Sequence, residues 1–438
     1  MPVMPSTWSP LLKGSLADQA SQSLREIADS LALPEPSGFG REASLAGGVT
    51  GQALFYAYYS LHTSDSAAAE RAAELLDRAA AELADQPMAP SFYAGFPGIA
   101  WTMEHLRGRL FEDDGEEEGA EEDDPIQEID EALLVPLSRS PWTGEYDLIG
   151  GLAGLGVYAL ERLPRPSAAE LLSRVVDRLA ETAETLDDGA AWFTPPERLP
   201  EWQRAIHTRG VYNLGVAHGL PGVIPVLAGA CAAGVAVERA RPLLDSSVRW
   251  LLARRYEPGI GSCFGTTYAP WEEAAPSRLA WCYGDPGIAA ALLAAARAVG
   301  EPEWERQAIE TALAAAARDE STALVRDTGL CHGAAGLAHL FNRMFQETGA
   351  ERLGEAARFW LGRTLRMRAP GEGIAGFRAW EVNPGGEPGW RADSGLLEGA
   401  AGIGLALLGA VSTVEPAWDR MFLVSLPPVV NAPSAKED

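Results

Sequence analysis

The stretch GDPGIAAALLAAA, residues 284–296, contains two glycines three positions apart, followed directly by a long apolar run. The same pattern, G-x-x-G and then an apolar helical run, occurs seven times along the chain. The seven motifs begin at Gly48, Gly95, Gly151, Gly219, Gly284, Gly333 and Gly399 and lie 47 to 68 residues apart. A motif that recurs in this way predicts a repeat architecture with one helical unit in each copy.

Amphipathic segments with helical periodicity alternate with these apolar runs. They span residues 16–33, 64–86, 126–139, 167–186, 237–256, 301–319 and 351–367. The alternation predicts seven inner helices enclosed by neighbours and seven outer helices with one face in water. Neither end of the series shows a polar capping repeat, which favours a closed ring over an open solenoid. The expected fold is all-α, a closed α/α toroid that covers residues 1–438 as one domain.

Loop lengths orient this ring. The connections from an outer helix to the next inner helix are long, as at 187–217, 257–283 and 368–398, and they meet the glycine motifs on one face. Long ordered loops beside helix N-termini are common places for binding and chemistry. The aromatic residues in these loops are Trp192, Phe193, Trp202, Trp380 and Trp390. They could form a peptide-binding groove, or they could simply anchor their own loops.

The charge balance excludes some partners. The 438 residues include 35 Lys and Arg against 61 Asp and Glu, a net charge of −26, which argues against binding nucleic acid or docking on an anionic membrane. Ten of the acidic residues fall in the run Glu112–Asp124, which we expect to be a solvated insertion. The most apolar stretch, 214–237, is interrupted by glycines and prolines, and we expect a buried helix there and no membrane span.

Cysteine usage points to a reducing compartment. Four cysteines in a chain of this size are too few for a disulfide scaffold, and residues 1–13 contain no secretory signal. We therefore expect a cytoplasmic protein, either free or peripheral to a membrane-associated biosynthetic complex.

Alignment of the seven copies on their first glycine reveals a candidate site. The two preceding positions hold Ala217-His218 in the fourth copy, Cys282-Tyr283 in the fifth and Cys331-His332 in the sixth. In a closed ring these positions would converge at the rim of one cavity. Cys282, Cys331 and His332 are ligand types that zinc prefers, and three protein ligands leave a position open, as in catalytic sites. The alternative is that both cysteines are small packing residues and His332 caps a helix.

Thiolate-rich zinc is a poor Lewis acid, but it can hold a substrate sulfur as a nucleophilic thiolate at neutral pH. The donor set therefore favours alkylation of sulfur over hydrolysis. A carbohydrate-active or terpenoid cyclase would need paired carboxylates in the cavity, and the acidic run is a low-complexity segment that does not supply them.

Four longer motifs resemble the signatures of the LanC family of lanthionine cyclases. They are YDLIGGLAG (146–154), YNLGVAHGLPG (212–222), SRLAWCYGDPG (277–287) and LCHGAAGLAH (330–339). The resemblance covers essentially the whole chain and implies a toroid of seven inner and seven outer helices with zinc at one mouth. It also implies Michael-type addition of precursor-peptide cysteine thiols to dehydroalanine or dehydrobutyrine, which forms lanthionine or methyllanthionine rings.

The resemblance assigns roles to individual residues. It makes Cys282, Cys331 and His332 the ligands of one Zn²⁺ per chain. His218 matches the general acid/base, Asp147 an acidic residue that could orient His218, and Arg278 a basic residue that could stabilise enolate charge. Tyr283 is a candidate for lining the cavity, and Asp285 is a candidate either for lining it or for a supporting role in the turn. Without the resemblance, Asp147 could be a helix cap, Arg278 a partner of a surface carboxylate and His218 a turn residue.

The implied partners are a dehydrated precursor peptide with leader and core, a separate dehydratase, since no dehydratase segment precedes the toroid, and an exporter. Two other functions fit the same motifs. One is an enzyme that adds an external thiol such as glutathione to dehydroamino acids. The other is a non-catalytic scaffold in which zinc organises a peptide-binding mouth.

Overall fold

The computed structural model describes residues 8–33, 42–110, 124–382 and 387–428, and the acidic run lies outside these residues except for Asp124. The described residues contain seven inner helices, as the glycine motifs predict. These are α2 (Val49–Thr63), α4 (Phe96–Leu106), α6 (Leu152–Arg162), α9 (Leu220–Ala232), α11 (Asp285–Val299), α14 (Ala334–Thr348) and α16 (Ala400–Val411).

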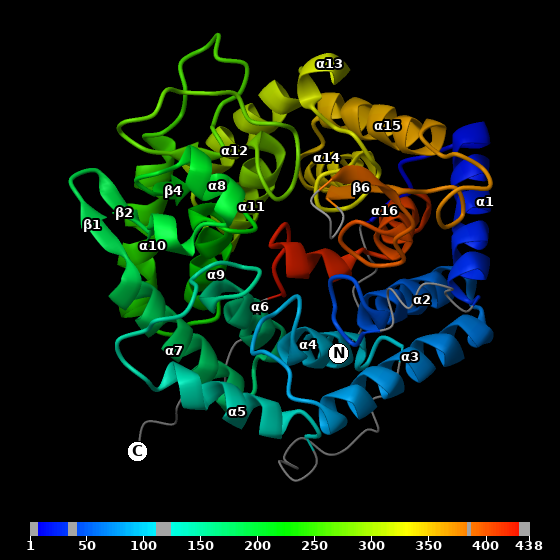
Figure 1. Ribbon diagram of the computed structural model, residues 1–438, viewed down its shortest axis with the longest axis horizontal. Coiled ribbons are helices and arrows are strands. Elements are labelled where there is room, and N and C mark those ends of the chain that lie inside the picture. The colour runs from blue at the N-terminus through cyan, green and yellow to red at the C-terminus, as the bar shows by residue number, and fades with distance from the viewer. Residues whose placement is uncertain (1–7, 34–41, 111–123, 383–386, 429–438) are drawn as a thin grey trace.

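Seven outer helices surround them within the same described ranges. These are α1 (Gly14–Leu31), α3 (Ser66–Asp85), α5 (Gln127–Leu137), α7 (Pro166–Thr182), α10 (Val237–Leu252), α12 (Pro302–Ala316) and α15 (Glu351–Arg366). Inner helices such as α9 and α16 are buried on nearly all sides, whereas outer helices such as α7 bury one face. The predicted α/α toroid is confirmed (Figure 1).

The ring closes between its first and last helices. Outer helix α1 and inner helix α2 both pack against α16, the last inner helix. The chain before α1 reinforces this contact, because the backbone N–H groups of Leu11 and Leu12 both donate to the Ala410 carbonyl, at 2.9 and 3.1 Å. Closure is therefore built from segments at opposite ends of the sequence.

A circuit of backbone hydrogen bonds joins the seven motifs at one end of the ring. It involves the residue two positions before the first glycine in every copy, with Leu148 acting as the donor in place of Ile149 at one step. The donor and acceptor pairs are Ala46 to Tyr93, Tyr93 to Ile149, Leu148 to Ala217, Ala217 to Cys282, Cys282 to Cys331, Cys331 to Leu397 and Leu397 to Ala46, at 2.9 to 3.5 Å. Positions that align in the repeat thus lie side by side, as the alignment predicts.

The G-x-x-G pattern has a steric cause. In each copy, a Cβ on the second glycine would lie only 1.8 to 2.6 Å from the carbonyl oxygen six residues earlier. Real Cβ atoms essentially never come within 3.0 Å of such an atom. The glycine therefore lets the loop fold closely over the first turn of the inner helix.

The centre of the ring is filled by η3 (Ala417–Phe422), a short 3₁₀ helix near the end of the described chain (Figure 1). The Trp281 indole N–H donates to the Phe422 carbonyl at 2.9 Å, and the Tyr93 hydroxyl donates to the Met421 carbonyl at 2.8 Å. The Asp419 carboxylate is fully buried. Residues of η3 therefore support the circuit of motifs from beneath.

The long loops contain short antiparallel strands that helical periodicity did not predict. They are β1 (Glu184–Leu186) with β2 (Gly189–Ala191), β3 (Phe193–Thr194) with β4 (Val211–Asn213) and β5 (Thr267–Tyr268), and β6 (Ala379–Val382) with β7 (Pro388–Arg391). Short helical turns, η2 (Pro196–Arg198), α8 (Glu201–Ile206) and α13 (Glu320–Ala323), also lie in loops. The predicted helix 167–186 ends earlier, at Thr182, because residues 184–186 pair with β2.

The apolar stretch 214–237 contains the buried helix α9, and a buried helix was expected there. Within the described part of the chain, no helix combines the length and the apolar character needed to cross a membrane.

Candidate metal centre and neighbouring residues

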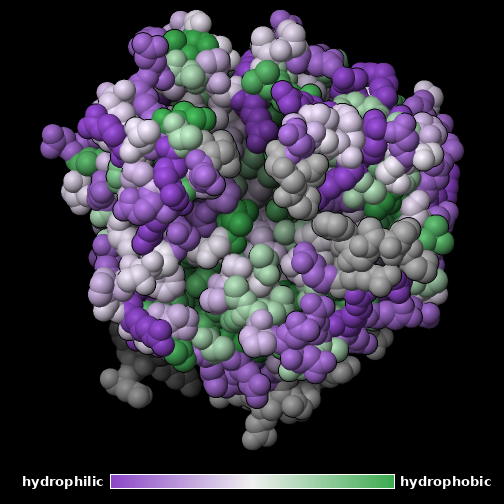
Figure 2. Space-filling model, viewed as in Figure 1, coloured by the Kyte–Doolittle hydropathy of each residue, from purple (hydrophilic) through white to green (hydrophobic). Residues whose placement is uncertain are grey.

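The candidate site lies along the circuit of motifs, on the loops of the third to seventh copies. Viewed along the axis of the ring, the molecule is hollowed near its middle, with hydrophilic residues above the hollow and more apolar ones below it (Figure 2). The N-termini of the inner helices and the long loops meet around the circuit. The side chains next to the circuit residues in the sequence therefore face a common space.

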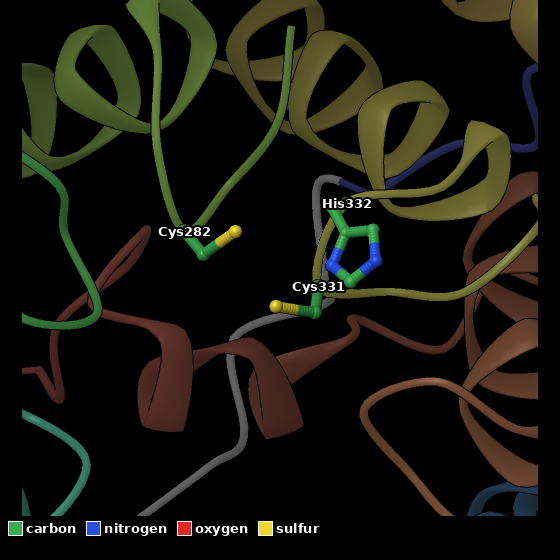
Figure 3. Close-up of side chains that lie close together, drawn as sticks. All are labelled: Cys282, Cys331 and His332. Carbon is green, nitrogen blue, oxygen red and sulfur yellow. The ribbon is translucent and has the colours of Figure 1, made fainter. Parts of the chain in front are cut away.

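Cys282, Cys331 and His332 lie together in this space. Cys282 comes from the loop before α11, and Cys331 and His332 come from the loop before α14 (Figure 3). One potential ligand atom from each residue lies within 4.8 Å of the other two. The backbone N–H groups of Trp281 and Cys282 both donate to the Cys331 carbonyl, at 3.2 and 3.3 Å, which fixes the two loops against each other.

The electrostatics of the cluster suit a metal ion. A hydrogen bond from Cys331 outweighs burial and, with His332, holds the pKa of the Cys282 thiol well below its usual value, while the pKa of Cys331 is raised. Burial lowers the pKa of His332, but Cys282 and the charge of Glu398 raise it to about 9. Two thiolates and one imidazole are a zinc donor set, so the residues fit zinc with one position open.

Arg278 lies directly beside this cluster. Its Nη2 atom is 3.7 Å from Cys282 Sγ, and its side chain is only partly buried. The guanidinium therefore places a positive charge next to the Cys282 sulfur.

His218 and Asp147 form a hydrogen-bonded pair, although 71 residues separate them. The His218 Nδ1 to Asp147 Oδ2 distance is 2.6 Å, and the other Asp147 oxygen accepts from the Gly150 backbone at 2.9 Å. Burial lowers the pKa of His218, but the hydrogen bond and charge of Asp147 raise it above its usual value. The His218 side chain is 45% exposed, so it is held at one nitrogen and open on its other side.

The backbone places this pair beside the cysteine cluster. The Ala217 N–H, next to His218, donates to the Cys282 carbonyl at 3.4 Å. The Tyr283 ring stacks against the His218 ring with centroids 6.2 Å apart, and its hydroxyl accepts from Asn213 Nδ2 at 3.1 Å. Tyr283 thus lies between the two groups of residues.

Asp285 lies elsewhere. It is fully buried at the start of α11, and its two oxygens accept from the backbone N–H groups of Cys263 and Phe264, at 2.8 and 2.9 Å. The carboxylate therefore fixes the loop before α11. Burial raises the pKa of the Cys263 thiol, and likewise that of Cys231, to about 11, which keeps both thiols protonated at neutral pH.

The loop aromatics divide between anchoring and exposure. Trp192 is buried, and its indole N–H donates to Thr182 Oγ1 at 3.1 Å, so it anchors its own loop. Trp380 and Trp390 pair across β6 and β7, and Trp390 is 44% exposed. Phe193 is partly buried, and the Trp202 side chain lies outside the described part of the molecule.

Two carboxylates near the cluster were missed by the sequence reasoning. Glu398 Oε1 lies 3.2 Å from His332 Nδ1, and Asp327 Oδ2 lies 3.9 Å from His332 Nε2. Burial raises the pKa of Glu398 to about 8, with a further contribution from Asp327 against the opposing effect of His332. A signal for Glu398 was present, because in the seventh copy it occupies the position that His218 and His332 hold in theirs.

Comparison with known proteins gives a family match and a fold match. The family described as "Lanthionine synthetase C-like protein" matches residues 41–423, which include all seven glycine motifs. The solved structure of nisin cyclase superposes with a TM-score of 0.70 at 18% identity, covering 94% of this chain and 98% of that one.

The structures of two sugar epimerases also superpose on this chain, with lower TM-scores. A sugar epimerase from a ruminal bacterium has a TM-score of 0.48 at 12% identity, and cellobiose 2-epimerase from Bacillus thermoamylovorans has 0.49 at 10%. Both superpositions cover 90% of this chain and 98% of the other.

Proposed function

Because the chain belongs to the lanthionine synthetase C-like family, we propose that it is a zinc-dependent lanthionine cyclase. Its substrate would be a dehydrated precursor peptide, with leader and core. The reaction would add a cysteine thiol of this peptide to a dehydroalanine or dehydrobutyrine residue, closing a lanthionine or methyllanthionine ring.

One observation carries this proposal. A Cys–Cys–His cluster and a His–Asp pair lie on neighbouring loops of one circuit, joined through the hydrogen bond from Ala217 to Cys282. Addition of a thiol to an activated double bond needs a nucleophilic sulfur and a group that moves a proton. The two sets of residues supply these functions side by side.

Cys282, Cys331 and His332 would hold the zinc ion. When bound, zinc would keep the substrate sulfur as a nucleophilic thiolate at neutral pH. Arg278, beside Cys282, stabilises the negative charge that develops on the carbonyl oxygen of the dehydroamino acid.

His218 would carry the proton in this reaction. The sulfur forms a bond to the β-carbon, the electrons of the double bond move to the adjacent carbonyl to give an enolate, and the α-carbon then takes a proton. Overall, the proton lost by the thiol is equivalent to the proton gained by the α-carbon. Asp147 accepts from His218 Nδ1, which leaves the other ring nitrogen to take up and release this proton.

Cyclisation conserves mass, so the test counts free thiols. A synthetic peptide with one dehydroalanine and one cysteine is incubated with the protein, and remaining thiols are then alkylated before mass spectrometry. A cyclase leaves the cysteine unalkylated. Full alkylation, with no loss of free thiol, would refute ring closure on this peptide.

The same assay separates the other functions. Added glutathione would raise the mass of the peptide if the protein adds external thiols, whereas a scaffold would bind the peptide and leave it unchanged.

Metal analysis tests the zinc site directly. We expect about one zinc per chain in the wild type and none in Cys282→Ala. His218→Asn should retain the zinc, because residue 218 is outside the donor set. It should close rings more slowly, because the group that moves the proton is lost. Normal cyclisation by His218→Asn would show that another group moves the proton.

A cyclase of this kind needs other proteins. We propose that a separate dehydratase forms the dehydroamino acids and that an exporter removes the product. We also propose that the protein works in the cytoplasm, free or peripheral to a membrane-associated biosynthetic complex. Copurification with a dehydratase encoded nearby would test the first of these partners.

A further inference from the structure

The imidazole of His332 faces a carboxylate at each of its ring nitrogens. Glu398 Oε1 is 3.2 Å from Nδ1, and Asp327 Oδ2 is 3.9 Å from Nε2. One ligand atom from each of the three residues lies within 4.8 Å of the other two. The histidine that completes the Cys–Cys–His cluster therefore lies between two carboxyl groups.

Asp327 is held rigidly by backbone groups. It is buried, and its two oxygens accept from the N–H groups of Gly329 and Trp380, at 3.3 and 3.1 Å. One bond belongs to the loop before α14 and the other to the start of β6. The Asp327 carboxylate is thus fixed beside the ring before any metal binds.

The turn at Asp327 does not itself require a negative charge. Asn213 occupies the same position of the fourth copy, six residues before the first glycine, and its Oδ1 accepts from Gly215 at 2.9 Å. Asp393 does the same in the seventh copy, accepting from Gly395 at 2.7 Å. An amide therefore closes this turn as well as a carboxylate does. A buried charge at Asp327 costs free energy, and His332 is a neighbour that could offset that cost.

The carboxyl group of Glu398 also lies where its burial costs free energy. Among the described residues, its Oε2 atom is buried and has no hydrogen-bond partner. Its Oε1 atom lies at ion-pair distance from His332 Nδ1, a nitrogen that also has no hydrogen-bond partner among the described residues. A buried carboxylate with an unsatisfied oxygen is destabilising, so its place beside a metal ligand indicates a function.

We propose that Asp327 and Glu398 are positioning residues for the metal centre. One ring nitrogen of His332 would bind the ion, the carboxyl group at the other nitrogen would accept its N–H and strengthen it as a ligand, and the second carboxyl group would keep the ring in place. Histidine ligands in metal sites almost always donate their second ring N–H to a carboxylate, a backbone carbonyl or water, which fixes the ring and raises its basicity. This inference rests on the zinc site of the proposed function. It makes the two carboxylates responsible for how tightly the ion is held.

Zinc affinity tests this directly, with a control built into the repeat. Asp327→Asn and Glu398→Gln each replace a carboxyl group by an amide, and Asp393→Asn does the same in the equivalent turn of the seventh copy. We expect competition with a chromogenic chelator to show roughly 10- to 100-fold weaker zinc binding in Asp327→Asn and Glu398→Gln. Asp393→Asn should match the wild type, and melting temperatures should show that all three variants are folded.

Cobalt supplies a second measurement that a purely structural role would not alter. The visible d–d bands of Co²⁺ bound to Asp327→Asn or Glu398→Gln should shift relative to the wild type, because the orientation and basicity of the imidazole change. In Asp393→Asn the bands should stay in place.

Several outcomes would overturn the inference. Wild-type zinc affinity in both Asp327→Asn and Glu398→Gln would overturn it alone and leave the proposed cyclase standing. Equal weakening in Asp393→Asn would show a general effect of charge, and two zinc ions per wild-type chain would point to a separate Asp–His–Glu site. A wild-type chain that binds no zinc would overturn the proposed metal centre together with this inference.

Discussion

Gly336→Ala is a sharp test of why the glycine motif recurs. Gly336 is the second glycine of the sixth motif, and a Cβ there would lie 1.8 Å from the Leu330 carbonyl oxygen. To reach the 3.0 Å that real Cβ contacts respect, the loop must move by at least 1.2 Å, which is 3.0 minus 1.8. The adjacent Cys331 donates its N–H to Leu397, so this shift strains the circuit of backbone hydrogen bonds.

The size of the effect is a balance of two terms. Replacing glycine by alanine in a helix stabilises the helix by up to about 1 kcal/mol. Overpacking typically costs 1 to 3 kcal/mol, and a backbone carbonyl cannot rotate away as a side chain can, so a cost of about 3 kcal/mol is expected here. The net result is a free energy of unfolding lower by about 2 kcal/mol.

Denaturant unfolding of three variants measures this balance. Gly98→Ala makes a similar clash, 2.1 Å from the Phe92 carbonyl, in a copy that contributes no cysteine or histidine to the metal cluster. Gly389→Ala meets no atom within 4 Å and should be nearly neutral. We expect Gly336→Ala and Gly98→Ala to lose similar stability, and Gly336→Ala alone to bind zinc more weakly. Equal stability of Gly336→Ala and Gly389→Ala would refute the steric explanation.

Two further outcomes follow from buried carboxylates. In Asp147→Asn, an amide N–H replaces the oxygen that accepts from His218 Nδ1, so ring closure should slow by roughly 10²- to 10⁴-fold. Because Asp147 raises the pKa of His218, the alkaline limb of the pH–rate profile should move to lower pH in this variant. An unchanged pH–rate profile would exclude the His218–Asp147 pair from the mechanism. Burial raises the pKa of Asp419, but Arg343 and His339 lower it from 3.8 to about 2. The ionised Asp419 therefore adds about 2 kcal/mol to the free energy of unfolding above pH 4, and this contribution is lost as the pH falls toward 2. Asp419→Asn removes the only fully buried carboxylate among the partners of Arg343 in the described residues and leaves it the more exposed Glu347 and Glu415. The variant should unfold more easily at pH 7 by up to about 3 kcal/mol, and urea titrations should find that this difference narrows below pH 4. A difference in the free energy of unfolding that does not change with pH would contradict the low pKa of Asp419.

The helices of the ring could be predicted because their signals are local. Seven glycine motifs mark the starts of the inner helices, and the periodicity of the intervening segments marks the outer ones. The short strands could not be predicted in this way. β1, for example, exists because it pairs with β2 and continues directly from an outer helix, so periodicity extends the predicted helix into the strand.

The candidate site was predicted in part for the same reason. Cys282, Cys331 and His332 share aligned positions, and a closed ring brings aligned positions together. Glu398 also lies at an aligned position, directly before the first glycine of the seventh motif, but the sequence analysis did not extend the alignment to that copy. Asp327 does not follow it, because it reaches His332 through the path of its loop and a hydrogen bond from β6.

The sequence by itself determined the number of repeats, the alternation of inner and outer helices, and the cysteine and histidine positions that converge. These properties depend on spacing along the chain, and spacing is visible in a sequence. Only the tertiary structure decided which carboxyl groups lie beside the metal cluster, where Glu398 and Asp327 face His332. Those contacts depend on how far each loop folds over its glycine, which is set by backbone packing between repeats rather than by residues close in sequence.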